Sequence, residues 1–331
     1  MPASHPVSHP RRHALLALAL ALAGICTPLL AQTSTWPSKP ITLVVPFPAG
    51  GGTDLVVRAL QPRLQKELGQ PLVIDNRAGA GGTLGSALVA RATPDGYTAG
   101  VATTSTHAVS VSVFPKLPFD PAKDFAYAGF IGTSPYVLAT TGGLGKPDTK
   151  ALLAALKAKP EGFSFASVGA GTVSHLLGEQ FKGVAKVPLV HIPYRGAAPA
   201  YTDLISGQVQ LMFDNPAGLV PYIRAGRIHA VATTAPNALL TGVPTFQQQG
   251  MAGFDQSLWY GIVFPAQTPK AVVERFNQAL NTVLSDRAVG AELAALGLNA
   301  ATGTPDALKA AVARDTIYWG RIAKAVGARV D

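Results

Sequence analysis

The chain has 331 residues, of which 48% are hydrophobic and only 14% are charged. This length suits about two domains, and so much apolar sequence can bury a large core, which excludes a disordered protein. The formal net charge is +9, but the basic residues are spread thinly, with no run longer than Arg11–Arg12. Because nucleic-acid binding needs clustered positive charge, we expect no nucleic-acid partner.

The first 31 residues have the pattern of an export signal. Arg11 and Arg12 precede an apolar stretch at 14–25, which is too short for the ~20 residues of a typical membrane span. Ala31 offers a small residue for cleavage, so we expect residues 1–31 to be removed and the mature protein to lie in the periplasm. The arginine pair leaves open whether export uses the Sec or the twin-arginine route.

Two alternatives to a cleaved signal remain. Cys26 suggests a lipoprotein, although Ile25 precedes it where a small residue is expected. An uncleaved membrane anchor is the other. Cleavage after Ala31 removes the single cysteine, and the mature chain can then form neither a disulfide nor a thiolate metal site.

The chain is organised around residues 41–54, which read ITLVVPFPAGGGTD. The apolar run at 41–45 is typical of a strand buried on both faces of a sheet. Glycines follow at 50–52, and Thr53 and Asp54 are good N-cap residues for the helical pattern that runs to Leu68. A helix N-terminus after a glycine loop presents free N–H groups and a positive dipole end, so the stretch predicts an anion site. A plain tight turn remains the alternative.

The order of strand, loop and helix recurs along the chain. Glycine or hydroxyl loops follow predicted strands at 75–82, 103–107, 167–175 and 193–199, and ligands in α/β sheets bind beyond such strand ends. We predict an α/β fold of two facing domains with parallel-type sheets, flanking helices and a ligand cleft between them. Domain I comprises 36–135 and 252–331, and domain II comprises 136–251. The predicted strands lie at 41–45, 71–74, 97–102, 125–131, 136–140, 163–168, 187–192, 209–213, 228–233 and 257–264.

No catalytic motif stands out in this sequence. It contains no G-x-S-x-G, no H-E-x-x-H and no Walker A ending. His107, His175, His191 and His229 have no metal-ligand spacing, so we expect no metal and no cofactor. His175 differs from the others, because it follows a glycine-serine loop by one turn and could fix the side chains of that loop.

Two aspartates have alternative interpretations. Asp54 and Asp214 could accept hydrogen bonds from a ligand amine or hydroxyl. Asp54 could instead cap a helix, and Asp214 could instead stabilise a turn.

Six sequence stretches resemble one known family. The chain is similar to the Bug receptors of Gram-negative bacteria, the extracytoplasmic solute receptors of tripartite tricarboxylate transporters. The similarity covers nearly the whole mature chain. Its motifs are WPSKPITLVVPFPAGGGTD (36–54), VIDNRAGAGGTLGS (73–86), PDGYT (94–98), FASVGAGTVSHLLGE (163–179), IPYRGAAPAYTDLISGQVQLMFD (192–214) and WYGIVFPAQTP (259–269).

The resemblance implies a two-domain, Venus-flytrap periplasmic binding protein that closes on a small ligand, often a carboxylate. It also implies a monomer and, as a partner, a tripartite tricarboxylate transporter membrane complex. The first domain would contribute the ligand-binding residues Phe47, Pro48, Ala49, Gly50, Asp54, Gly79, Ala80, Ser105 and Thr106. The second would contribute Ser167, Gly169, Thr172, His175, Tyr194 and Asp214.

One departure from the family pattern bears on the ligand. Val168 and Ala170 stand where more polar residues are usual, which makes this wall more apolar. We therefore favour a dicarboxylate or an aromatic carboxylate over a free amino acid. An α/β enzyme acting on a small carboxylate, an isomerase or a hydrolase, is the alternative function, and it would need a base within reach of its substrate.

Overall fold

The computed structural model describes residues 1–3, 36–159 and 161–330. The predicted signal segment and its cleavage position at Ala31 lie outside the described residues, apart from the first three. The fold discussed here is that of the compact unit beginning at Pro37. Within the described residues, no helix combines the length and apolar character needed to cross a bilayer.

The first sheet has six strands in the order β11-β4-β10-β3-β1-β2. β1 lies between β2 and β3 and runs parallel to both, and its residues are almost fully buried, as the apolar run predicted. β10 runs antiparallel to its neighbours β3 and β4. The strands are β1 (Ile41–Val45), β2 (Leu72–Asn76), β3 (Thr98–Thr103), β4 (Phe125–Pro135), β10 (Ser257–Pro265) and β11 (Asn299–Ala300).

The second sheet has five strands in the order β7-β6-β8-β5-β9. β6 runs parallel to β7 and β8, whereas β5 runs antiparallel to β8 and β9. The strands are β5 (Val137–Thr141), β6 (Ser164–Ser167), β7 (Val190–Pro193), β8 (Leu211–Asp214) and β9 (Ile228–Thr233).

Each sheet therefore has a parallel part, as predicted, and one inner strand of opposite direction. The reason is the chain path. β5 follows β4 after a single residue, Tyr136, and β10 is reached from β9. Both strands enter their sheet from the other sheet, without the helical crossover that returns a chain in the parallel direction.

Helices cover both sheets. They are α2 (Gly52–Leu68), α3 (Thr83–Ala90), α4 (Ser110–Val113), α5 (Thr149–Ala158), α6 (Val173–Ala185), α7 (Ala197–Ser206), α8 (Pro216–Arg224), α9 (Lys270–Leu284), α10 (Arg287–Ala294) and α11 (Pro305–Ala325). Shorter turns are η1 (Ala80–Gly82), the π-helical η2 (Ser105–Val109), η3 (Gly142–Leu144) and η4 (Ala238–Leu240).

Our sequence analysis missed α8. Its two prolines and a glycine, Pro216, Pro221 and Gly218, make the segment look like a loop. Pro216 occupies the start of the helix, where the missing N–H would have no intrahelical acceptor and a proline is well tolerated. Asn215, the residue that precedes this helix, lines a pocket described below.

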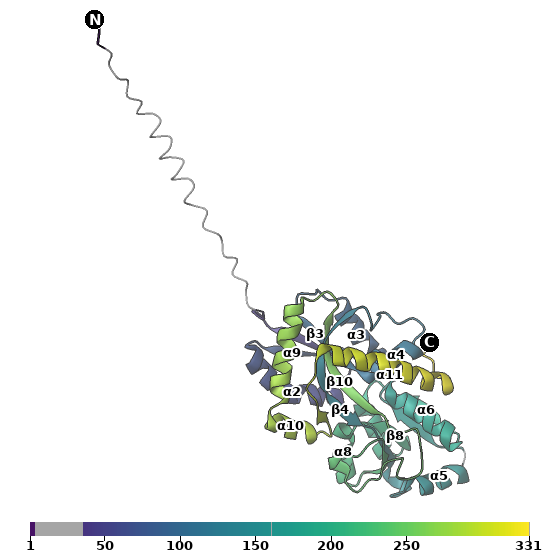
Figure 1. Cartoon of the computed structure of the whole chain (residues 1–331). Coiled ribbons are helices and arrows are strands. Elements are labelled where there is room, and N and C mark those ends of the chain that lie inside the picture. Colours follow the sequence, from purple (N-terminus) through teal and green to yellow (C-terminus); the bar gives the residue numbers. More distant parts are fainter. Residues whose placement is uncertain (4–35, 160, 331) are drawn as a thin grey trace. The chain divides into compact units, whose positions relative to one another are not determined.

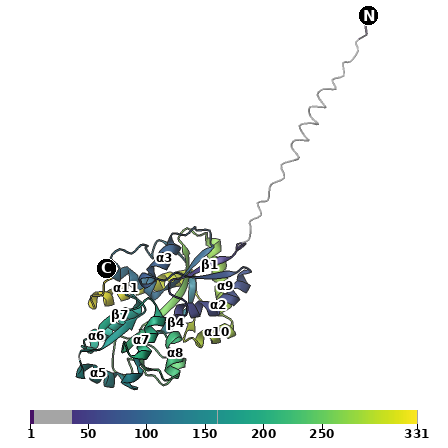
Figure 2. The same ribbon diagram turned by 180° about the vertical axis from the view of Figure 1, so that it is seen from behind.

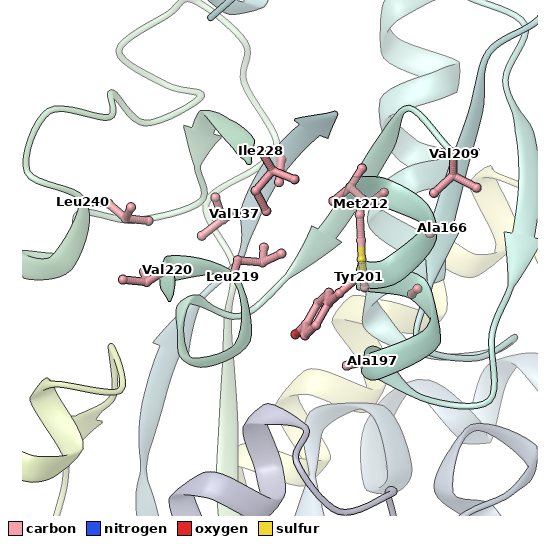
Figure 3. Close-up of a cluster of buried hydrophobic side chains, with 13 residues drawn as sticks. Val137, Ala166, Ala197, Tyr201, Val209, Met212, Leu219, Val220, Ile228 and Leu240 are labelled. Atoms are coloured by element: carbon pink, nitrogen blue, oxygen red, sulfur yellow. The ribbon is translucent and has the colours of Figure 1, made fainter. Parts of the chain in front are cut away.

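The second sheet is covered on both faces. Alternate strand residues point to opposite faces of a sheet, and Val137, Ala166 and Met212 share one core cluster with side chains of α7 and α8 (Figure 3). On the other face, Phe165 contacts α6 so closely that a side chain at Gly178 would overlap its ring. This double covering explains why these strands read as continuous apolar runs.

The helices of the N- and C-terminal parts of the chain pack on the first sheet. α3 contacts β1, β3 and β10, while α9 and α11 contact β4. The C-terminal helices thus pack back on the sheet that begins the chain, as predicted. Figures 1 and 2 show α2, α9 and α10 grouped on one side of the fold, and α5 to α8 grouped around the second sheet.

Candidate ligand-binding site

Two adjoining cavities lie where the loops of the two sheets meet, and they share Phe47, Pro48, Val168 and Gly196. We call the smaller, of about 50 Å³, the inner pocket; it is further lined by Gly51, Gly52, Thr53, Thr103, Thr104, Ser105, Tyr136, Ala197, Asp214, Asn215, Leu258 and Tyr260. We call the larger, of about 550 Å³, the outer cavity; it is further lined by Ala78, Gly79, Ala80, Gly81, Gly82, Leu84, Gly169, Ala170, Pro193, Tyr194, Arg195 and Val330.

Three helices begin at the inner pocket. Gly51 is the N-cap of α2, Gly196 that of α7 and Asn215 that of α8, and in none of them does the cap side chain accept a hydrogen bond from the helix. Each helix therefore directs N–H groups that no cap side chain satisfies, together with the positive end of its dipole, toward this pocket. Such a convergence favours an anion.

The size of the inner pocket limits what it can hold. One water molecule needs about 10–15 Å³ of this kind of volume, so 50 Å³ corresponds to a few waters. A group of carboxylate size fits this space, whereas a ring or a long chain has to lie in the outer cavity.

Hydroxyl groups complete the inner pocket. Ser105 Oγ accepts a hydrogen bond of 3.1 Å from the backbone N–H of Val173, which links η2 to the start of α6. Tyr136 and Tyr260 are buried, and burial together with the nearby Asp214 carboxylate raises the pKa of both phenols. Both therefore keep their protons at neutral pH and can donate hydrogen bonds.

Asp214 is the acidic side chain of the inner pocket. Its Oδ2 accepts a hydrogen bond from the Tyr201 hydroxyl at 2.6 Å, and its Oδ1 accepts from Asn215 N at 2.8 Å and Asn215 Nδ2 at 3.0 Å. Burial raises the pKa of Asp214 to about 6, although these hydrogen bonds act in the opposite direction. The other amide atom of Asn215, Oδ1, is buried and has no hydrogen-bond partner within the described part of the chain.

Two glycine loops meet beside the outer cavity. Residues 79–82 all have positive φ, including Ala80 at 46°, a conformation that favours glycine. A Cβ on Gly81 would lie 2.7 Å from the carbonyl oxygen of Ala170. The backbones of the two loops therefore approach each other closely at the outer cavity.

The structure brings eight of the fifteen predicted site residues into the cavity walls. Phe47 and Pro48 line both cavities. Ser105 and Asp214 line the inner pocket, and the outer cavity is lined by Gly79, Ala80, Gly169 and Tyr194.

Asp54 and its loop lie outside both linings. The Asp54 carboxylate accepts hydrogen bonds from Gly50 N, Arg58 Nε and Asn76 Nδ2 at 2.8 to 3.0 Å. Burial tends to raise the pKa of Asp54, but these hydrogen bonds outweigh it and the pKa lies below its ordinary value. Asp54 therefore holds the first glycine loop in shape, while Ala49 and Gly50 are exposed and the glycines that reach the pocket are Gly51 and Gly52.

Three predicted hydroxyl residues support the walls from behind. Thr106 Oγ1 is hydrogen-bonded with Thr103 and His107. Ser167 Oγ lies 2.7 Å from His191 Nε2, and Thr172 Oγ1 donates to the Gly169 carbonyl at 2.7 Å. None of the three lines either cavity.

His175, the last of the predicted set, packs on a second histidine. Its ring stacks on that of His191 with centroids 3.9 Å apart, and ligand atoms of both lie within 4.8 Å of Glu179. Gly171 N–H donates to His175 Nδ1 at 3.2 Å, which places the proton of the neutral ring on Nε2. With neither nitrogen of His175 offering a free lone pair, this cluster suits packed neutral imidazoles rather than a metal centre.

Several wall residues escaped the sequence analysis. Gly51 and Gly52 belong to the predicted anion-binding stretch at 41–54, and their signal is the glycine loop before the N-cap residues Thr53 and Asp54. Tyr136 and Tyr260 lie on or beside strands, and Asn215 precedes the missed helix α8. Of these last three residues, only Asn215 carried a local signal, as an N-cap type directly before a proline.

Two mixed α/β units with a polar pocket between their loops define the class of periplasmic binding proteins. The family model described as "Tripartite tricarboxylate transporter family receptor" matches residues 56–328. The chain belongs to this family of solute-binding receptors, and the resemblance inferred from the motifs is confirmed. Among the curated proteins it is similar to Protein BugT of Bordetella pertussis, with 34% identity over 320 residues that cover 96% of this chain and 98% of BugT.

Solved structures agree with this assignment. The periplasmic binding protein BugD has 33% identity and a TM-score of 0.85, over 89% of this chain and 99% of BugD. R. palustris Rpa4515 with adipate has 31% identity and a TM-score of 0.86, over 89% and 100%. MatC from Rhodopseudomonas palustris with bound malate has 32% identity and a TM-score of 0.82, over 87% and 99%. The predicted two-domain fold class is confirmed.

Proposed function

We propose that this receptor captures a small organic carboxylate, with one carboxylate group of the ligand in the inner pocket. The observation that carries the proposal is the convergence of α2, α7 and α8, all without side-chain caps, on a pocket of about 50 Å³. Oriented N–H groups bind an anion without a formal positive charge. The adipate and malate complexes of two relatives support this ligand class.

The domains proposed from the sequence fit the two sheets. All strands of the second sheet lie within 136–251, and all strands of the first lie within 36–135 or 252–331. The chain crosses between the sheets at Tyr136 and again before β10. We propose these crossings as the hinge about which the domains close on the ligand.

Binding without catalysis is the second part of the proposal. A general base has to lie within hydrogen-bond reach of its substrate. Asp214 is held by Tyr201 and Asn215, and His107 and His175 line neither cavity. These placements favour a receptor over an isomerase or a hydrolase.

The remaining parts of the proposal concern export, oligomeric state and the transporter partner. We propose export with removal of residues 1–31, a monomer in the periplasm, and delivery of the ligand to a tripartite tricarboxylate transporter. N-terminal sequencing of the exported protein tests the first part, with Gln32 as the expected first residue. Recovery of Met1 or of a lipid-modified Cys26 would contradict it.

Calorimetry and thermal-shift measurements test the ligand class. The panel holds dicarboxylates, monocarboxylates, amino acids, neutral amides and sugars, added to freshly purified mature protein. We expect carboxylates to raise the melting temperature, because a ligand that binds only the folded state stabilises it by mass action. Stabilisation by a sugar with no response to any carboxylate would refute the proposal, and a response confined to amino acids would point to Asp214 as an ammonium partner.

A further inference from the structure

The outer cavity contains a cation whose role nothing described so far explains. Among its described lining residues, Arg195 is the one charged side chain. We propose that Arg195 binds a second anionic group of the ligand, so that this receptor selects dicarboxylates over monocarboxylates of the same length. The proposal rests on the proposed function, because it requires the first carboxylate to occupy the inner pocket.

Arg195 is the one arginine that lines either cavity in the described part of the chain. No ion pair or side-chain hydrogen bond within that part engages its guanidinium group. An arginine without a protein partner, at the rim of a cavity, is available to a ligand. The arginines that have an acidic partner are Arg58, Arg63, Arg77, Arg275 and Arg314.

The backbone around Arg195 is fixed. Tyr194 N–H donates to the Ser167 carbonyl at 3.0 Å, and Gly196 N–H donates to the Val168 carbonyl at 3.2 Å. The Tyr194 hydroxyl donates to Asp203 at 2.6 Å, so the nearest acid in sequence already has a partner. Arg195 therefore lies on a fixed segment, so ligand binding has to order its side chain but not its backbone.

The position of Arg195 couples the two cavities. It directly precedes Gly196, which lines both cavities and begins α7 at the inner pocket. One carboxylate in the inner pocket and a second beside Arg195 would thus be held by neighbouring residues of one loop. The spacer between the two groups would run along the outer cavity.

The apolar lining of the outer cavity makes a polar partner necessary for a second carboxylate. Apart from Arg195 the side chains are apolar or aromatic, among them Phe47, Leu84 and Val168. A carboxylate placed against such a wall loses water contacts at a cost unless a partner replaces them. A guanidinium group offers a planar pair of donors that matches a carboxylate, so it both offsets this cost and orients the ligand.

The test compares matched ligands on matched variants. Calorimetry at low salt measures the dissociation constants of straight-chain dicarboxylates of three to eight carbons, of the monocarboxylates of equal length, and of terephthalate and benzoate. The variants are Arg195→Gln and Arg227→Gln. Arg227 is an exposed arginine that lines neither cavity and has no ion pair within the described residues, so its loss controls for the change in net charge.

We expect the wild type to bind its best dicarboxylate about fivefold more tightly than the matching monocarboxylate, the upper range for an ion pair open to solvent. Arg195→Gln should remove this preference for dicarboxylates and leave the affinity for monocarboxylates within about twofold of the wild type. Arg227→Gln should keep the preference. Higher salt should shrink the preference, because the pair is exposed to screening.

Three results would overturn the inference. The first is that the wild type binds every dicarboxylate and its matching monocarboxylate with equal affinity. The second is that Arg195→Gln keeps the preference for dicarboxylates. Both results leave the proposed carboxylate function intact. An equal loss of preference in Arg227→Gln would assign the effect to net charge instead of to Arg195. Absence of binding by every carboxylate would refute the inference together with the proposed function.

Discussion

The inner pocket and the outer cavity are built from different parts of the chain. The inner pocket is made of helix N-termini and buried hydroxyls and measures about 50 Å³. The outer cavity measures about 550 Å³, and its walls are apolar side chains, glycines and one arginine. Backbone groups are fixed by the fold itself, whereas exposed side chains can change without disturbing it. Under the proposed function, this contrast means that the fold provides the carboxylate site and the side chains of the outer cavity choose the ligand.

The largest effect should come from filling the inner pocket. A Cβ on Gly52 would lie only 2.2 Å from Asn215 Oδ1 across the site. We expect Gly52→Val to weaken carboxylate binding by up to about 100-fold, since overpacking costs ~1–3 kcal/mol. The melting temperature without ligand should change little, because the overlap is with the facing domain.

Gly183→Ala is the control for this variant. Gly183 lies in α6, and a Cβ there meets nothing within 4 Å. Calorimetry measures the carboxylate affinity of both variants. Wild-type affinity in Gly52→Val would show that the inner pocket is not where the carboxylate binds.

Closure should respond to the contact between the glycine loops. Gly81 and Gly69 share the left-handed conformation, with φ and ψ of 63° and 20° for Gly81 and of 71° and 12° for Gly69. Only a Cβ on Gly81 would clash, with the Ala170 carbonyl at 2.7 Å. Alanine at either position has a similar left-handed backbone cost of about 1–2 kcal/mol. Gly81→Ala alone should oppose closure and weaken binding about tenfold.

Small-angle scattering with saturating ligand measures closure directly. The wild type and Gly69→Ala should become more compact on binding, and Gly81→Ala should do so less completely. If the two variants bind and compact equally, the loop contact plays no part in closure. Identical scattering of the wild type with and without ligand would argue against hinge closure itself.

The Asp214 side chain should make binding depend on pH. Its pKa in the folded protein is about 6, above the ordinary 3.8, because it is buried. Above pH 6 the carboxylate is ionised and repels a bound anion; below pH 6 it is neutral. Binding an anion therefore favours the protonated form, and affinity should rise about threefold between pH 7.5 and pH 5.5.

Asp214→Asn removes the titrating group and should flatten this pH profile. Affinities measured by calorimetry in buffers of matched ionic strength, with the melting temperature checked at each pH, give the comparison. A wild-type affinity that falls on acidification would contradict the sign predicted here.

The smallest effect should come from the wall of the outer cavity. Leu84 lines this cavity, whereas Leu88, one turn further along α3, does not, and both are exposed. Leu84→Ser should weaken long dicarboxylates about threefold, because a buried CH₂ is worth ~0.8 kcal/mol, and should leave short ones unchanged. Leu88→Ser should change neither. Equal effects on short and long ligands would contradict the assignment of the ligand body to this cavity.

Much of the fold was predictable because the signals are local. The uncharged run at 41–45 indicated a buried strand, and it forms β1, an inner strand of the first sheet. The first glycine loop indicated a helix N-terminus, and α2 begins there. The missed helix α8 shows the limit, because prolines that usually break helices are tolerated at a helix start.

The site was only partly predictable, because its members meet from distant parts of the chain. Asp54 is a good N-cap type, yet in the structure it binds Arg58, Asn76 and the backbone of its own loop. Ser167 ends strand β6 and His175 lies in the first turn of the following helix, but both contact the ring of His191 and line neither cavity. Nothing in the spacing of these residues distinguishes a wall residue from one that supports the wall.

The sequence alone determined the α/β order of elements, the two glycine loops and the family, because each depends on residues close together in the chain. The tertiary structure decided that Gly52 meets Asn215, that three helix N-termini surround one small pocket, and that Arg195 stands at the rim of a larger cavity. The physical reason is that the periodic patterns of strands and helices depend on residues only a few positions apart in the chain. Which loop faces which depends on how two separately packed sheets come together.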